Sequence, residues 1–157
     1  MGKRITGRLL AAVALLFVAA CTSTPQASRE RDADAKRFDS QPGSATIYVY
    51  RPDFADEEMS SSHSVLWIGG RLIGSTLPRS YFRVDVRPGR HLLRGDGPDL
   101  GRLTLDTTAG DVYFVSLNVH GGNSHFERVT PETGKQAMLR CCALLENWAP
   151  GQRPLLR

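Results

Sequence analysis

The spacing of hydrophobic and polar residues changes along the chain, and each pattern predicts a different kind of segment. An unbroken apolar run fills residues 9–20, and a polar stretch over residues 22–44 follows, with Phe38 as its large apolar side chain. From residue 45 onward, short apolar or alternating runs are separated by turns that contain Gly and Pro, which indicates strands. Beyond Thr130 the apolar positions take helical spacing.

About eight strands are expected in the middle of the chain, because their residues alternate in polarity or are rich in β-branched and aromatic side chains. The expected strands cover residues 45–51, 64–68, 71–74, 81–86, 90–94, 102–106, 111–119 and 125–129. In the fourth of them, Phe82 and Val84 share one face and Arg83 lies on the other. The run 111–119 is apolar on both faces, which is typical of a central strand. Gly69-Gly70 suits a two-residue hairpin turn with positive φ.

One short helix is expected over residues 131–145, with Thr130 as its N-cap and Pro131 at its first position. Its apolar positions follow the spacing i, i+3, i+4, i+7 and are Met138, Cys141, Cys142 and Leu145. Residues 146–157 are expected to form a loose tail. The sequence thus predicts a mainly β fold, a small antiparallel β-sandwich of about seven or eight strands with one short C-terminal helix. An open barrel is the alternative.

The apolar run 9–20 is 12 residues long, whereas a helix that crosses a bilayer needs about 20. With the basic residues before it, the run is typical of a secretory signal. Small residues precede a cysteine at its end, in the order Val18, Ala19, Ala20 and Cys21. This stretch resembles the lipobox of bacterial lipoproteins. An ordinary signal peptide cut at Ala20, with Cys21 as a free thiol, is the alternative.

The lipobox resemblance implies that residues 1–20 are a signal peptide cleaved before Cys21. It also implies a diacylglycerol on the Cys21 thiol and acylation, for example with palmitate, of the new amine. Several acyl chains are enough for stable membrane anchoring. The residue after the acylated cysteine is Thr22, whereas an Asp at that position favours retention in the inner membrane of enterobacteria. The expected location is therefore the outer membrane, facing the periplasm, with the inner membrane as the alternative.

Residues 21–44 are then the acylated Cys and a flexible tether, since they have too little apolar surface to offset ordering entropy. A helix over residues 29–37 would bury nothing.

The chain carries 20 basic and 16 acidic residues, a formal net charge of +4. Loss of residues 1–20 removes Lys3, Arg4 and Arg8 and no acidic residue, which lowers the charge to about +1. A nucleic-acid-binding domain is usually strongly basic. No nucleic-acid partner is therefore expected.

The stretches 45–52, 65–74, 81–83 and 87–91 together resemble a family of small proteobacterial lipoproteins with a domain of unknown function. In part they are similar to PEGA-like envelope modules, which share the order Gly, Gly, Pro-Gly-x-His. The resemblance covers about residues 45–140, although Gly69 stands where Asn or an acidic residue is commoner. It implies a small β-sandwich over residues 45–145, an envelope location and no assigned activity or catalytic residue.

Three groups of residues are candidates for catalysis or metal binding. His120 and His125 flank a glycine-rich turn, but they lack the further ligands of a metal site, which favours solvated histidines in a hairpin loop. The run 60–63, three serines and His63, lacks a nucleophile elbow and a third group. The run 56–58 lacks the alternating ligands of a calcium loop. No catalytic residue, metal ligand or cofactor is expected.

Two further groups are candidates for contact with a partner. Arginines that could share an exposed face, and so bind lipid headgroups, lipopolysaccharide or an anionic wall polymer, are Arg83, Arg87, Arg90 and Arg94. Scattered arginines on an outer sheet face are the favoured interpretation. Cys141 and Cys142 are adjacent and are candidate redox or partner-facing thiols. Two buried thiols are favoured, because adjacent side chains diverge on a helix, while a vicinal disulfide and an intermolecular bridge are the alternatives.

The expected function follows from the anchor and from the lack of a catalytic set. It is that of a lipid-anchored, non-enzymatic lipoprotein of the cell envelope, an interaction or accessory module with an unknown envelope protein as partner. The alternative is a periplasmic binder of an anionic wall polymer or lipopolysaccharide. A less favoured alternative is an enzyme or ligand-binding protein that uses the histidine loop.

Overall fold

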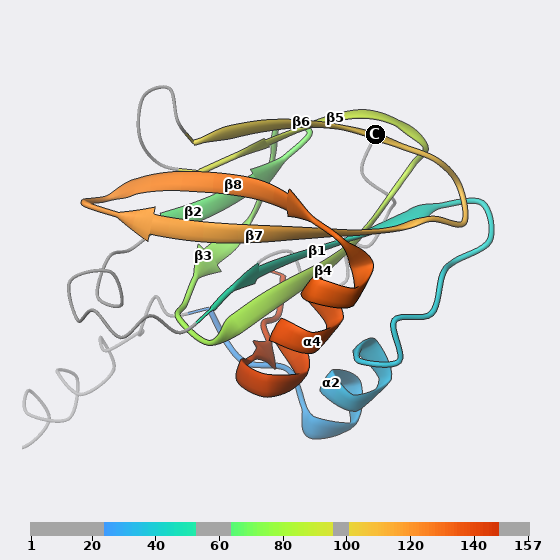
Figure 1. The fold of residues 1–157 in the computed structure, drawn as a ribbon, viewed down its shortest axis with the longest axis horizontal. Coiled ribbons are helices and arrows are strands. Elements are labelled where there is room, and N and C mark those ends of the chain that lie inside the picture. Colours follow the sequence, from blue (N-terminus) through green and yellow to red (C-terminus); the bar gives the residue numbers. More distant parts are fainter. Residues whose placement is uncertain (1–23, 53–63, 96–100, 148–157) are drawn as a thin grey trace, which may run out of the picture.

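The strands form two packed sheets, and the helices lie against one of them (Figure 1). The computed structural model describes residues 24–52, 64–95 and 101–147, and the elements below are those of this part of the chain. The helices are α2 (Arg29–Ala35) and α4 (Pro131–Cys141). The strands are β1 (Ala45–Arg51), β2 (Ser64–Ile68), β3 (Arg71–Thr76), β4 (Ser80–Val86), β5 (Gly89–Arg94), β6 (Arg102–Thr107), β7 (Val112–His120), β8 (Asn123–Val129) and β9 (Ala143–Leu144).

The expected sandwich of short strands is confirmed, with three differences in detail. The five-stranded sheet has the order β8-β7-β1-β4-β9 and the four-stranded sheet the order β3-β2-β5-β6. β7 runs parallel to β1, and β9 runs parallel to β4, so the sandwich is not purely antiparallel. Parallel neighbours require a crossover connection. Between β4 and β7 the chain crosses to the opposite sheet, forms the β5–β6 hairpin there, and returns to place β7 beside β1. The ninth strand was not expected, and the helix α2, which the sequence allowed over residues 29–37, packs against the sandwich.

The local patterns in the sequence correspond to the observed faces and turns. Phe82 and Val84 lie in the core between the sheets, whereas Arg83 lies on the outer face of β4. β7 is interior, with β8 and β1 as neighbours. Gly69 and Gly70 have φ of 58° and 79°, as the hairpin between β2 and β3 requires.

A second apolar cluster covers the outer face of the five-stranded sheet, beneath α2 and α4. Tyr48 and Phe114 stack there with ring centroids 5.3 Å apart, and Phe38 meets both rings edge-on. α4 approaches so closely that a Cβ added at Gly134 would lie 2.5 Å from the Cβ of Phe114. The glycine that weakens the helix pattern is therefore what allows the helix to pack. Aromatic pairs of this kind stabilise a cluster beyond the area that they bury.

Helix α4 begins as expected and ends early. The Thr130 side chain accepts a hydrogen bond from Thr133 N, and Pro131 is the first helical residue. The helix ends at Cys141, not at residue 145, and Cys142 is extended with φ −120° and ψ 142°. The next residues form β9 beside β4, because the backbone N–H groups of Ala143 and Leu145 donate to carbonyls of that sheet.

The expectation that a helix over residues 29–37 would bury nothing is wrong. Ala35 of α2 is only 2% exposed, and the Tyr48 hydroxyl donates a 2.6 Å hydrogen bond to the Ala35 carbonyl. Ser28 caps the helix by accepting from Arg31 N. We call residues 24–38 the N-terminal arm. Hydrogen bonds to distant parts of the chain hold the arm in place. The pattern of polar and apolar residues within the arm could not predict these partners.

Candidate functional site

The four arginines that could have shared one face lie on different surfaces, as the favoured interpretation of scattered arginines implied. Arg83 is on the outer face of the five-stranded sheet, where its Nε lies 3.8 Å from a carboxylate oxygen of Asp85. Arg90 and Arg94 are exposed on β5, in the opposite sheet. The chain passes from one sheet to the other at Arg87, between β4 and β5. The two outer faces of a sandwich point in opposite directions, and sequence proximity does not keep these side chains together.

The four-stranded sheet carries a smaller arginine surface of its own. The Arg94 guanidinium lies 4.7 Å from the centroid of the Trp67 ring, and Arg102 is its cross-strand neighbour on β6. Arg90 Nε donates a 3.0 Å hydrogen bond to Asp106. Both described helices lie against the other sheet (Figure 1). We call this surface the open sheet face, and its residues are Trp67, Arg90, Leu92, Arg94 and Arg102.

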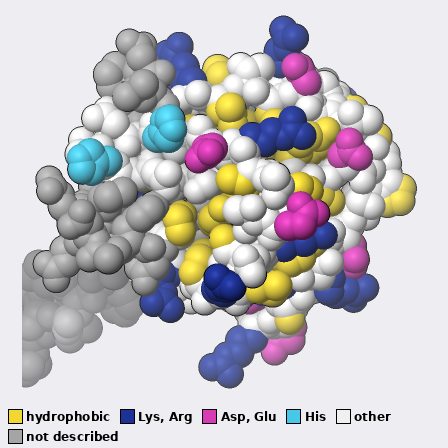
Figure 2. All heavy atoms as spheres, in the orientation of Figure 1, with side chains coloured by type: hydrophobic (Ala, Val, Ile, Leu, Met, Phe, Trp, Pro, Cys, Tyr) yellow, Lys and Arg dark blue, Asp and Glu magenta, His cyan; other side chains and the backbone are white. Residues whose placement is uncertain are grey.

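The expected histidine loop is the turn of the β7–β8 hairpin. His120 and His125 are both exposed and face Asn123 and Asn118 across the hairpin. Among the described residues, no group of three or more His, Cys, Asp or Glu side chains could hold a metal ion. On the face that carries β8, β7 and α4, acidic and basic side chains are interspersed (Figure 2). The serine–histidine run 60–63 and the acidic run 56–58 lie outside the described residues.

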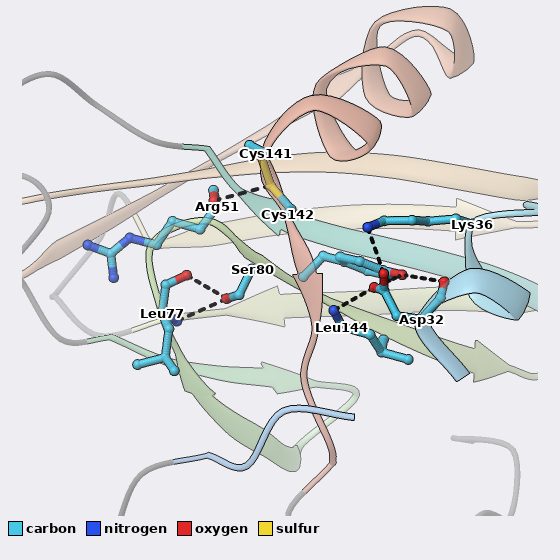
Figure 3. The surroundings of a disulfide bond; sticks show 9 residues. Asp32, Lys36, Arg51, Leu77, Ser80, Cys141, Cys142 and Leu144 are labelled. Carbon is cyan, nitrogen blue, oxygen red and sulfur yellow. Dashed lines mark hydrogen bonds and ion pairs between the residues drawn. A yellow bond between two sulfur atoms is a disulfide. The ribbon is translucent and has the colours of Figure 1, made fainter. Parts of the chain in front are cut away.

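Cys141 and Cys142 are joined by a vicinal disulfide (Figure 3). The favoured interpretation of two buried free thiols is therefore wrong, and one of the alternatives holds. The two side chains can meet because the helix ends at Cys141 and Cys142 is extended. Cys142 is 4% exposed, whereas Cys141 is partly exposed. The Cys142 sulfur lies 3.7 Å from the Arg51 carbonyl oxygen, a contact in which a disulfide sulfur has no hydrogen to donate.

The carboxylate of Asp32 links α2 to two distant parts of the fold (Figure 3). Its Oδ1 accepts hydrogen bonds from the backbone N–H of Leu144 at 2.8 Å and from the Tyr81 hydroxyl at 2.9 Å. Its Oδ2 accepts a 2.7 Å ion-pair hydrogen bond from Lys36 Nζ. Burial, together with the bond to Asp32, raises the pKa of Tyr81. Sequence reasoning missed this carboxylate, because one acidic residue in a polar stretch gives no signal of its partners.

The backbone of the N-terminal arm pairs with the segment 143–146. Ala27 N donates to Leu144 O, and Glu146 N donates to Pro25 O, each at 2.8 Å. Glu146 also forms an ion pair with Arg31. At the start of the arm, Thr24 is 2% exposed, and its hydroxyl donates a 2.8 Å hydrogen bond to Ser75 O. Thr24, where the described part of the chain begins, is therefore already anchored to the sandwich, and it lies three positions after Cys21 in the sequence.

The fold is a mainly β two-sheet sandwich with helices on one outer face. No protein-family model matches the chain, and no solved structure matches it. An uncharacterized protein of Haemophilus influenzae is 29% identical over 129 residues, which is 78% of this chain and 75% of that protein. In the part of the chain that the structure describes, none of the helices is long and apolar enough to cross a bilayer.

Proposed function

We propose that this protein is a lipid-anchored, non-enzymatic lipoprotein of the bacterial cell envelope that acts as an interaction or accessory module for an envelope protein. The observation that carries the proposal is the position of the fold relative to Cys21. Thr24 is already buried against β3, and three extended residues span at most about 10 Å. An acyl group on Cys21 would hold the sandwich against the membrane surface.

This geometry favours a module that works at the bilayer surface, and Thr22 in place of Asp favours the outer membrane, facing the periplasm. A long tether would let a domain search for partners far from the lipid, whereas a docked arm restricts both its height and its orientation. Polar side chains in the interior of the described region serve to hold the structure together, which supports a non-enzymatic role. Asp32, Tyr48 and Tyr81 each form a hydrogen bond that attaches the arm.

The anchor is tested by metabolic labelling with a palmitate analogue and by membrane fractionation. The full chain should incorporate the label and sediment with outer membranes, and Cys21→Ser should abolish both. The matched control is Cys141→Ser with Cys142→Ser, which removes the other two cysteines and should keep the label. Label retained in Cys21→Ser would exclude the proposal.

The interaction role is tested by crosslinking in intact cells, capture of the lipidated chain and mass spectrometry. One recurrent envelope protein, absent when Cys21→Ser is captured, is the expected result. Turnover of a small molecule that is lost on mutation of one polar residue would contradict a non-enzymatic role.

A second candidate function is the binding of an anionic wall polymer or lipopolysaccharide through the open sheet face. The observation that favours it is the guanidinium of Arg94 over the Trp67 ring with Arg102 beside it, since an arginine held on an aromatic ring suits phosphate-bearing polymers. The runs 53–63 and 96–100 hold six acidic residues and no Lys or Arg. Those charges oppose a polyanion, so this function stands second.

A further inference from the structure

The junction between α4 and β9 is a segment that could continue as a helix. Residues 141–145 contain no Gly or Pro, and their Ala and Leu residues are good helix formers. Met138, Cys141 and Leu145 also keep the spacing of one helix face. The chain nevertheless leaves the helix at Cys142, which is extended. The local sequence therefore does not by itself explain why the helix ends here.

The disulfide supplies the missing reason. Successive side chains on an α-helix point about 100° apart, so two adjacent cysteines that both stay helical cannot bring their sulfurs together. The bond between Cys141 and Cys142 requires one of them to leave the helix, and Cys142 has done so. The Cα atoms are 3.7 Å apart, below the range of about 4.4–6.8 Å for ordinary disulfides, and departures from that range make the bond easier to reduce.

The segment that the disulfide keeps extended is the one that holds the N-terminal arm. β9 has two residues and lies between β4 on one side and the arm on the other. The backbone N–H of Leu144 donates a hydrogen bond to Asp32, and the carbonyl of Leu144 accepts one from the backbone N–H of Ala27. A helix that continued through Leu144 would direct its N–H to the carbonyl of Arg140 and away from Asp32, and the helical backbone would no longer pair with Ala27. Docking of the arm and extension of α4 are therefore mutually exclusive uses of this segment.

We propose that the Cys141–Cys142 disulfide is a thiol–disulfide exchange site for a protein dithiol, and that its reduction releases the N-terminal arm by allowing α4 to extend into β9. A thiolate of the dithiol attacks Sγ of Cys141, the more exposed of the two residues, and forms a mixed disulfide. The bond between Cys141 and Cys142 breaks, and Cys142 leaves as a thiolate that takes up a proton. The second thiol of the reductant then displaces Cys141, which is protonated in turn, and the dithiol becomes a disulfide. Two electrons and two protons pass to this protein.

The surroundings fit both redox states. The Arg51 carbonyl oxygen, 3.7 Å from the Cys142 sulfur, becomes an acceptor for the S–H group that reduction creates. Released residues 24–36 could extend by about 40 Å. In a chain anchored at Cys21, reduction would convert a docked arm into a tether. That consequence rests on the proposed lipid anchor, whereas the exchange reaction and the release of the arm do not.

The release is tested on the full chain by limited trypsin digestion with and without prior reduction by thioredoxin as the dithiol. Arg29, Arg31 and Lys36 in and beside α2 are the cleavage sites that report on the arm. The oxidised chain should be cut slowly there, and reduction should raise the rate several-fold. Differential alkylation and mass spectrometry of the peptide that begins at Cys141 measure how much disulfide was reduced.

Two variants keep the test decisive. Cys142→Ser should be cut rapidly without reductant and should not respond to it, and far-UV circular dichroism should show more helix than in the oxidised chain. Asp32→Ala should free the arm in both redox states while the disulfide still forms. Amide exchange in β7 should stay slow throughout, which separates release of the arm from unfolding of the sandwich.

Three results would overturn the proposal. They are free thiols at Cys141 and Cys142 in the chain isolated without reductant, a disulfide that thioredoxin reduces only after unfolding, and equal cleavage of the arm in the oxidised and reduced chains. Cys21→Ser should give the same result as the full chain. A failed anchor would thus leave this test intact, and a failed exchange would leave the anchor untouched.

Discussion

Asp32 and Leu144 lie 112 positions apart in the chain, and a 2.8 Å hydrogen bond from the backbone N–H of Leu144 to Oδ1 of Asp32 joins them. This bond links the beginning of the fold to its end. It also couples α2, which leads to the proposed lipid anchor, to the strand that follows the disulfide. The attachment of the arm therefore depends on few groups, and single substitutions can test it.

Replacement of Asp32 by Ala should lower the free energy of unfolding by about 1–3 kcal/mol, because a part-buried N–H and the Tyr81 hydroxyl lose their acceptor. Urea unfolding followed by fluorescence measures the change. The matched control is Asp34→Ala on the same helix, whose side chain is 67% exposed and forms an ion pair with Arg37 at 3.5 Å. That change should stay within about 0.5 kcal/mol. Equal losses in both variants would contradict the role assigned to Asp32.

Replacement of Gly134 by Ala should destabilise the protein although Ala is the better helix former. The gain in helix propensity is about 1 kcal/mol, but the new Cβ would meet the Phe114 side chain at 2.5 Å, and overpacking costs about 1–3 kcal/mol. Thermal unfolding should give a lower Tm. Gln136→Ala, at an exposed position of α4, is the control and should leave Tm the same or slightly higher. A Tm raised by Gly134→Ala would show that α4 can move away from the sheet.

The stability of the protein should fall at alkaline pH because of its buried tyrosines. Burial raises the pKa of Tyr48 to about 12, whereas a tyrosine in the unfolded chain has a pKa of about 10. Above pH 10 the unfolded chain loses the proton and the folded chain keeps it, so unfolding becomes more favourable as pH rises. The contribution of Tyr48 is complete below pH 10 and is lost by pH 12, at about 1.4 kcal/mol per pH unit.

Urea unfolding between pH 9 and pH 11 measures the slope with which the free energy of unfolding falls as pH rises. Tyr48→Phe should reduce it, and Tyr81, whose pKa is also raised by burial, should account for part of the remainder. Tyr113→Phe is the comparison, since Tyr113 lies on the opposite face of the sheet. A slope that Tyr48→Phe leaves unchanged would show that Tyr48 does not contribute.

Reversal of charge on the open sheet face should strongly weaken binding to lipopolysaccharide or isolated wall polymer if the second candidate function holds. Arg94→Glu with Arg102→Glu should weaken binding at low salt, and the residual binding should lose its salt dependence because the counterions are no longer displaced. The matched control makes the same charge change on α4, with Lys135→Glu and Arg140→Glu. Equal loss in both pairs would indicate a response to net charge, and binding unaffected by either pair would exclude this face.

The elements whose cause is local were predictable from the amino-acid sequence alone. The bounds of β1 and β2, the alternation that places Phe82 inward and Arg83 outward, and the Thr130 cap of α4 were all predictable. These features follow from polarity at a period of two, from turn residues and from capping chemistry within a few positions. The likeness to envelope lipoproteins also came from local motifs, and it stays a prediction.

Features that depend on residues far apart in the chain became visible in the three-dimensional fold and not before. It separated Arg83 from Arg94, because the chain changes sheets between them. It ordered the arm through Asp32 and ended α4 at Cys141, although the local pattern favoured a flexible tether and a longer helix. The physical reason is the same in each case. A hydrogen bond to a distant backbone group or a change of sheet depends on where the whole chain travels, and the polarity of neighbouring residues carries no record of that path.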